Sequence, residues 1–151
     1  MPHLPPFFIF QRHSKTKVFP VGLQCISTLK QLKISNCPNL MTLPELTPLE
    51  YLGIYRCEPN LTSLLEISCL ISLRSLGVKG FPNLITFPKS IRNLISLETL
   101  IIWRCPNLTT LPDDGFLKSL QRLEILECPR LSEKYKNKID KDFPNLEIEW
   151  V

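Results

Sequence analysis

The feature that most constrains the fold of this chain is a stretch of text that recurs along it. Residues 97–112 read LETLIIWRCPNLTTLP, and similar text occupies residues 29–44, 49–64, 73–88 and, for its first part only, 120–131. Each copy begins with a leucine, and these leucines are spaced 20, 24, 24 and 23 residues apart: Leu29, Leu49, Leu73, Leu97 and Leu120. Self-similarity at a nearly fixed period indicates that each copy is one structural unit stacked on the next.

Each unit has the pattern of a short strand followed by a turn. Apolar residues alternate with others, as at Leu100 and Ile102, and this period of two is typical of a strand. Proline follows in most units, as at Pro106, and ends the strand because it lacks an N–H donor. A period of about 20–29 residues with the text L-x-x-L-x-L is the signature of a leucine-rich repeat. The sequence therefore predicts a curved α/β leucine-rich repeat solenoid, with one parallel sheet of about six short strands on its concave face and loops and short helical turns on its convex face.

The chain is predicted to contain an arm and a repeat domain. Residues 1–18 fit no repeat and are expected to form an irregular N-terminal arm, in which the text FFIF is either one short strand or an adhesive apolar segment. Residues 19–151 are predicted to form the leucine-rich repeat domain, with about five repeats and a C-terminal capping helix and strand over 132–151. Because nothing before the first repeat resembles an amphipathic cover, we expect the chain to be the C-terminal part of something longer.

The segments between the strands are predicted to form the convex face and the cap. Residues 63–72 and 89–96 are each compatible with one or two helical turns. The capping helix is predicted to begin with Ser132 as its N-cap. The final strand is predicted to align Leu146 with Leu123, since they are again 23 residues apart.

Composition and charge exclude several classes of function. The net charge of +4 is too small to indicate binding to nucleic acid or to an anionic membrane. The first ten residues lack the basic segment and cleavage site of a signal peptide. No run approaches the ~18 apolar residues that cross a membrane. We therefore expect no nucleic-acid or membrane partner and a cytoplasmic location, with the nucleus as a further option.

The cysteines are predicted to be structural thiols in a reducing compartment. Four of the six hold equivalent positions in successive repeats, and one repeat has phenylalanine there: Cys37, Cys57, Phe81, Cys105 and Cys128. A position that accepts phenylalanine is expected to be a buried apolar site. The chain has no C-x-x-C, and its two histidines lie within the arm, so neither zinc spacing nor a nucleophile–base arrangement is present. The sequence therefore predicts no metal, no cofactor, no small-molecule substrate and no enzymatic activity.

The turn that follows the strands resembles that of a known family. It recurs as CPNLMTLP at 37–44, FPNLITFP at 81–88 and CPNLTTLP at 105–112, and the chain ends with ECPRLSEKYKNKIDKDFPNLEIEW at 127–150. Both features resemble the C-terminal leucine-rich repeats of plant intracellular nucleotide-binding leucine-rich repeat disease-resistance proteins, especially the coiled-coil class. The resemblance covers residues 19–151. It does not extend to the family's ATPase switch, since the chain has no G-x-x-x-x-G-K-[ST] loop.

The resemblance implies a protein-recognition module of plant innate immunity. Such a module binds a pathogen effector or a guarded host protein, or holds the receptor's own nucleotide-binding domain inactive. One alternative is a substrate adaptor of a ubiquitin ligase, although no F-box-like helical segment precedes the repeats. A second is a cell-surface receptor ectodomain, whose repeats typically contain Gly and Ile-Pro and whose caps contain paired cysteines. A third is a non-functional remnant of a truncated receptor gene.

The predicted binding site is the concave face, because the residues between the core positions project from it. Aromatic residues combined with arginine are the composition of binding hot spots. The candidate partner-binding residues are Tyr51, Tyr55, Arg56, Ile101, Trp103, Arg104, Arg122 and Leu126. Trp103 is the expected anchor. The alternative is that neighbouring segments cover some of these side chains.

Overall fold

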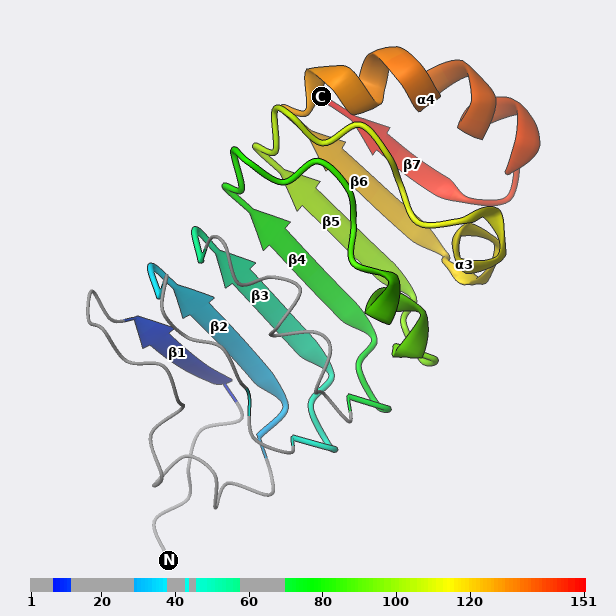
Figure 1. Cartoon of the computed structure of the whole chain (residues 1–151). Helices are drawn as coiled ribbons and strands as arrows, with labels where there is room; N and C mark the ends of the chain where they lie inside the picture. Colours follow the sequence, from blue (N-terminus) through cyan, green and yellow to red (C-terminus); the bar gives the residue numbers. More distant parts are fainter. Residues whose placement is uncertain (1–6, 12–28, 38–42, 44–45, 58–69) are drawn as a thin grey trace, which may run out of the picture.

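The computed structural model describes residues 7–11, 29–37, 43, 46–57 and 70–151. Within them, seven strands form one sheet in which every strand is parallel to its neighbours and the spatial order follows the chain (Figure 1). The strands are β1 (Phe7–Gln11), β2 (Gln31–Ser35), β3 (Tyr51–Tyr55), β4 (Ser75–Lys79), β5 (Thr99–Trp103), β6 (Arg122–Leu126) and β7 (Glu147–Trp150). The helices are the 3-10 helix η1 (Lys89–Asn93) and the α-helices α3 (Asp114–Ser119) and α4 (Pro129–Asp142).

The predicted fold class, α/β with one parallel sheet, is confirmed. The sheet has one strand more than the sequence predicted, because the FFIF text forms β1 and pairs with β2 over Phe7–Gln11. Of the two interpretations of that text, the strand is the correct one. The predicted boundary between residues 18 and 19 lies outside the described residues.

The sheet is held in register by two rows of buried side chains. One row consists of Leu32, Leu52, Leu76, Leu100 and Leu123, and the other of Ile34, Ile54, Val78, Ile102 and Ile125. All ten side chains are fully buried. Burying such a side chain contributes about 1.5–3 kcal/mol, so these rows fix both the face that is buried and the alignment of neighbouring strands.

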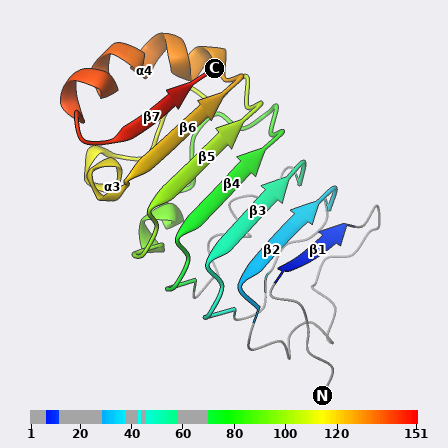
Figure 2. The same ribbon diagram turned by 180° about the vertical axis from the view of Figure 1, so that it is seen from behind.

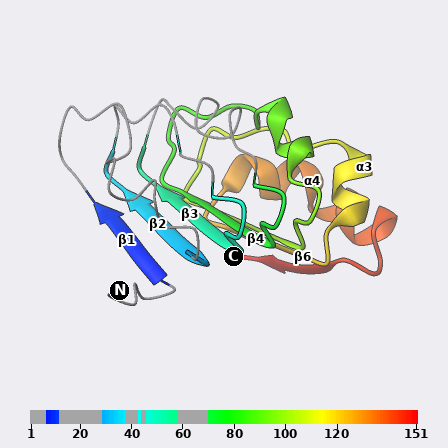
Figure 3. The same ribbon diagram turned by 90° about the horizontal axis from the view of Figure 1, so that it is seen from below.

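The two faces of the sheet have different surroundings. Figure 3 shows the helices and return segments together on one side of the strands, with the other side bare. Figure 2 views the sheet from this bare side, which we call the open face. Helix η1 lies within residues 89–96, as predicted, whereas residues 63–69 of the other expected helical segment lie outside the described residues.

A left-handed residue follows five of the strands and turns the chain toward the covered side. These residues have φ between 53° and 75° and are Asn36, Arg56, Gly80, Arg104 and Glu127. Each N–H still donates to the next strand, as Arg56 N–H does to the Lys79 carbonyl at 2.9 Å. The side chain after this residue can therefore turn inward without a loss of backbone pairing.

The inward side chain at this turn is the one predicted to fill the core. The four repeat cysteines and Phe81 are all at most 3% exposed, and the described cysteines are thiols. Burial raises the pKa of Cys57 to about 11. A side-chain hydrogen bond with Cys105 lowers the pKa of Cys128, whose Sγ also accepts the Cys105 N–H at 3.4 Å. The remaining two cysteines, Cys25 and Cys69, lie outside the described residues.

The C-terminal cap differs from the prediction in two respects. Helix α4 begins at Pro129 after Cys128, and Ser132 lies inside it, donating its N–H to the Cys128 carbonyl at 3.1 Å. Ser132 is therefore not the N-cap, because proline, whose missing N–H costs nothing at the first helical position, already starts the helix. In β7 it is Ile148, not Leu146, that pairs with Leu123. Within the described residues, no helix combines the length and apolar character of a membrane span.

Candidate functional site

All eight candidate residues lie on the open face. The strand register places Tyr51 in line with Arg122, Ile101 beside Glu124, and Tyr55 in line with Trp103 and Leu126. Arg56 and Arg104 follow β3 and β5 as left-handed residues and lie at the end of the same rows. The predicted site is therefore one continuous surface across β3 to β6.

The large side chains of this surface are partly buried. Tyr51, Tyr55, Ile101, Trp103 and Leu126 have intermediate exposure, whereas Arg56 and Arg104 are exposed. The rings are covered in part by one another and by nearby polar chains of the same face. This is a local form of the covering that the sequence analysis kept as an alternative.

The two tyrosines form a pair that lies over glycine. Their hydroxyls are 2.7 Å apart and share a hydrogen bond. A Cβ atom at Gly53 would lie 2.7 Å from the Tyr55 hydroxyl, and one at Gly77 would lie 3.5 Å from that of Tyr51. Glycine at these two neighbouring positions thus leaves the space that the hydroxyls occupy. Burial and the hydrogen bond to Tyr55 raise the pKa of Tyr51, so the pair stays neutral.

Trp103 lies between two cations. The Lys79 ammonium is 3.8 Å from the ring centroid, and the Arg104 guanidinium carbon is 5.5 Å from it. Arg104 Nε also donates to Glu127 at 2.7 Å, and this hydrogen bond is the main reason that the pKa of Glu127 is lowered. The ring is thereby held flat under charged groups, which limits its exposure but leaves it on the surface.

Arg122 is the centre of an acidic cluster at the other end of the face. Its guanidinium bonds Glu124 and Glu149, each at 3.3 Å, and also Glu147. Hydrogen bonds to Glu124 and then Glu147 raise the pKa of Arg122. With three carboxylates around one cation, this end of the face carries net negative charge.

The opposite end of the face contains a polar hollow. It has a volume of about 260 Å³ and is lined by Ser35, Asn36, Tyr55, Arg56 and Lys79, from the carboxyl ends of β2, β3 and β4. The sequence analysis included Tyr55 and Arg56 among the candidates but missed Lys79. The available signal was the register, which aligns Lys79 with Tyr55 and Trp103.

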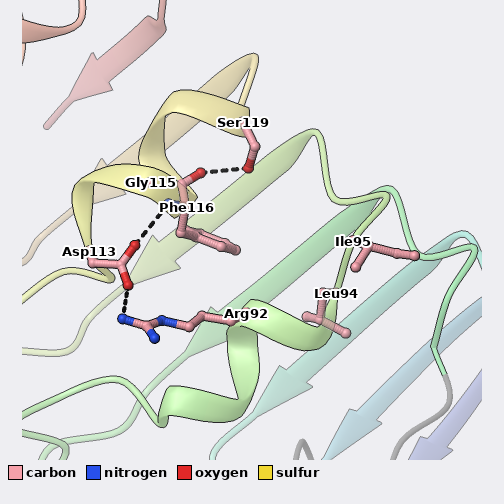
Figure 4. Close-up of a pocket in the computed structure, with 7 residues that line it drawn as sticks. All are labelled: Arg92, Leu94, Ile95, Asp113, Gly115, Phe116 and Ser119. Carbon is pink, nitrogen blue, oxygen red and sulfur yellow. Dashed lines mark hydrogen bonds and ion pairs between the residues drawn. The ribbon is translucent and has the colours of Figure 1, made fainter.

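A second hollow lies on the covered side, between η1 and α3 (Figure 4). It has a volume of about 480 Å³, and its walls are Arg92, Leu94, Ile95, Asp113, Gly115, Phe116 and Ser119. Asp113 caps α3 by accepting the Phe116 N–H at 2.9 Å and also pairs with Arg92. Ile95 is 77% exposed beside it, and Ile71 is 53% exposed. The repeated text Leu-Ile-Ser-Leu, at 70–73 and 94–97, was the signal for these exposed isoleucines.

The described residues contain no group of three or more histidine, cysteine or acidic side chains arranged to hold a metal ion. No known protein matches: no family model fits this chain, and no curated protein or solved structure is significantly similar to it. The function is therefore argued from the residues and geometry of the open face.

Proposed function

We propose that this chain is a curved leucine-rich repeat solenoid that acts as a protein-recognition module of a plant intracellular immune receptor. Its open, concave face binds a pathogen effector or a guarded host protein, or contacts the receptor's nucleotide-binding domain and keeps it inactive. The module works in the cytoplasm or the nucleus by surface complementarity, without catalysis, metal or cofactor.

The observation that carries this proposal is the continuity of the candidate surface. Three aromatic rings and three arginines from β3, β5 and β6 share one bare face of the sheet, on a backbone fixed by the buried leucine and isoleucine rows. Tryptophan, tyrosine and arginine are the residues enriched in binding hot spots. A rigid scaffold lowers the conformational entropy lost when a partner binds them.

Affinity capture from plant leaf extract tests the proposal. The bait is the full chain, and retained proteins are quantified for wild type, Trp103→Ala and the double variant Lys118→Gln/Arg130→Gln on α3 and α4. A hot-spot residue contributes about 2 kcal/mol or more, so Trp103→Ala should reduce the retained partner at least about tenfold. The helix variant should retain it. Retention that is equal for all three baits contradicts the proposal.

The same variant must remain folded. In urea unfolding, Trp103→Ala should lower the free energy of unfolding by about 1 kcal/mol, because the ring is only partly buried and its contact with Lys79 is an exposed cation–π pair. The reference is Phe81→Ala, which opens a cavity in the core at a cost of about 3–5 kcal/mol. A loss for Trp103→Ala as large as that for Phe81→Ala would assign the ring to the core.

A further inference from the structure

The open face is electrically divided. On β2, β3 and β4 and the residue after each, the side chains of this face include three cations and no carboxylate: Lys33, Arg56 and Lys79. On β6 and β7 and the residue after β6, they include Arg122 and four carboxylates: Glu124, Glu127, Glu147 and Glu149. Strands β3 and β6 are about 14 Å apart at ~4.8 Å per strand, which exceeds the Debye length of about 8 Å at physiological salt. The two ends therefore act on a partner separately.

Arginine is satisfied at the acidic end of the face but not at the basic end. Arg104 and Arg122 each bind carboxylates of this chain. Among the described residues, no carboxylate lies within ion-pair distance of Arg56, which is exposed. Its backbone N–H donates to the Lys79 carbonyl, and both side chains line the polar hollow. Two cations therefore converge on one cavity wall.

The other walls of the hollow offer hydrogen bonds. Ser35 contributes a hydroxyl, Asn36 an amide, and Tyr55 a hydroxyl that already bonds Tyr51. Charge-assisted hydrogen bonds from arginine and lysine to a carboxylate are shorter and stronger than neutral ones. The chemistry of the lining thus selects a small anionic group.

The size of the hollow separates a side chain from a free ligand. Its volume of about 260 Å³ is below the ~300–1,000 Å³ of pockets that enclose drug-sized molecules. An extended polyanion such as a nucleic acid would also run into the acidic cluster around Arg122. A polypeptide can place an acidic residue at one end of the face and neutral or basic residues at the other.

We propose that the hollow between Arg56 and Lys79 receives an aspartate or glutamate side chain from an acidic segment of the partner protein, with the tyrosine pair and Trp103 contacting the residues that flank it. This inference rests on the proposed function, since it names the chemistry of the partner at the same face. It predicts which part of a partner surface docks on β2 to β4.

A peptide titration followed by ¹H–¹⁵N NMR on the full chain tests this assignment. The probe is acetyl-Gly-Glu-Glu-Phe-Glu-Glu-Gly-amide, and its control replaces every glutamate with glutamine. The glutamate peptide should bind at least about tenfold more tightly and shift the backbone amides of Asn36, Arg56 and Gly80. Raising the salt concentration should reduce the difference, since the groups are exposed to solvent.

Three variants sharpen the test. Arg56→Gln/Lys79→Gln should remove the preference for the glutamate peptide, whereas Lys118→Gln/Arg130→Gln makes the same charge change on the helices and should keep it. Arg56→Glu/Lys79→Glu should reverse the preference, so that acetyl-Gly-Lys-Lys-Phe-Lys-Lys-Gly-amide binds more tightly than the glutamate peptide. The reversal is a gain of binding that an unfolded variant does not produce.

Three outcomes overturn the inference. They are equal binding of the glutamate and glutamine peptides, chemical-shift changes confined to β6 and β7, and displacement of the glutamate peptide from Arg56 by an oligouridylate that binds as tightly. In each case the proposed function still stands if Trp103→Ala abolishes capture of a partner. Loss of that dependence on Trp103, with peptide binding intact, would instead separate the acidic site from the immune-recognition role.

Discussion

At the scale of single residues, Asp113 shows how a charge on the surface fixes an element. Its carboxylate accepts the Phe116 N–H and pairs with Arg92 on η1, so it caps α3 and ties that helix to the preceding unit. The hydrogen bond with Phe116, followed by the charge of Arg92, lowers its pKa below the ordinary value of 3.8. Both interactions favour the charged form in the folded state only.

The sign of the pH dependence follows from this shift. A depressed pKa adds stability above the unfolded value, and that stability is lost as the pH falls through the folded value. Asparagine also caps helices but carries no charge, so Asp113→Asn isolates the charge. We expect wild type to melt at a higher temperature than Asp113→Asn at pH 6 and the difference to vanish below pH 3.8. Thermal melts across this range measure it, and a difference that persists in acid contradicts the explanation.

The residues of the candidate site were predictable from sequence, but their contacts were not. The period of two places Tyr51, Tyr55 and Trp103 on one face wherever the strands align. The pairing of the tyrosine hydroxyls over Gly53, and the position of Lys79 over Trp103, depend on side-chain rotamers and on neighbours 20 or more residues away in sequence. Register supplies those neighbours, and it is known only once the sheet has formed.

At the scale of the element, the strand ends depend on a left-handed residue. Gly80 has φ of 75°, and a Cβ atom there would lie 2.8 Å from Cγ of Arg56. Gly80→Ala should therefore cost about 1–2 kcal/mol, the penalty for an L-residue in this region. Gly77→Ala is the control, since its Cβ would be at ordinary contact distance, 3.5 Å from the nearest atom, and it should change stability by less than about 0.5 kcal/mol.

Urea unfolding of both alanine variants measures this difference. Equal losses would show that the strand end tolerates alanine and that backbone conformation at Gly80 contributes little. The arginines at the equivalent positions bear on the interpretation, because Arg56 and Arg104 already adopt φ of 54° and 55°. They occupy a backbone conformation that is unfavourable for them, at positions that hold their side chains on the open face.

Sequence predicted the elements better than their limits. Strands β2 to β6 were recognisable because leucine and β-branched residues alternate before a turn. The register of β7 was not, because α4 makes the last return segment longer, so Ile148 pairs with Leu123 after 25 residues. A helix rises about 1.5 Å per residue against about 3.3 Å for an extended chain, so more residues are needed to return to the sheet.

At the scale of the whole molecule, the structure is one sheet over one core. Buried side chains form a single cluster from Leu29 to Phe143, and Trp150 and Ile148 of β7 pack against it. No strand between β2 and β6 has a core that is separate from those of its neighbours. Unfolding of a short array with this continuity is expected to be cooperative rather than unit by unit.

The two tryptophans of the chain allow this cooperativity to be measured at two places. Trp103 reports on β5 in the middle of the sheet, and Trp150 reports on β7 at its end. Trp103→Phe and Trp150→Phe each leave a single fluorophore. The second substitution also removes a buried Nε1–H that has no hydrogen-bond partner among the described residues, so it should be close to neutral.

We expect the urea midpoint from tryptophan fluorescence to coincide with the circular dichroism midpoint of the same variant, for both variants, under reducing conditions. Comparison within each variant removes any effect of the substitution on stability. If Trp150 fluorescence changes at lower urea than the dichroism of Trp103→Phe, then α4 and β7 unfold as a separate unit. The open face from β2 to β6 would then keep its alignment without them, and the acidic cluster, which needs Glu147 and Glu149, would be lost before the basic hollow.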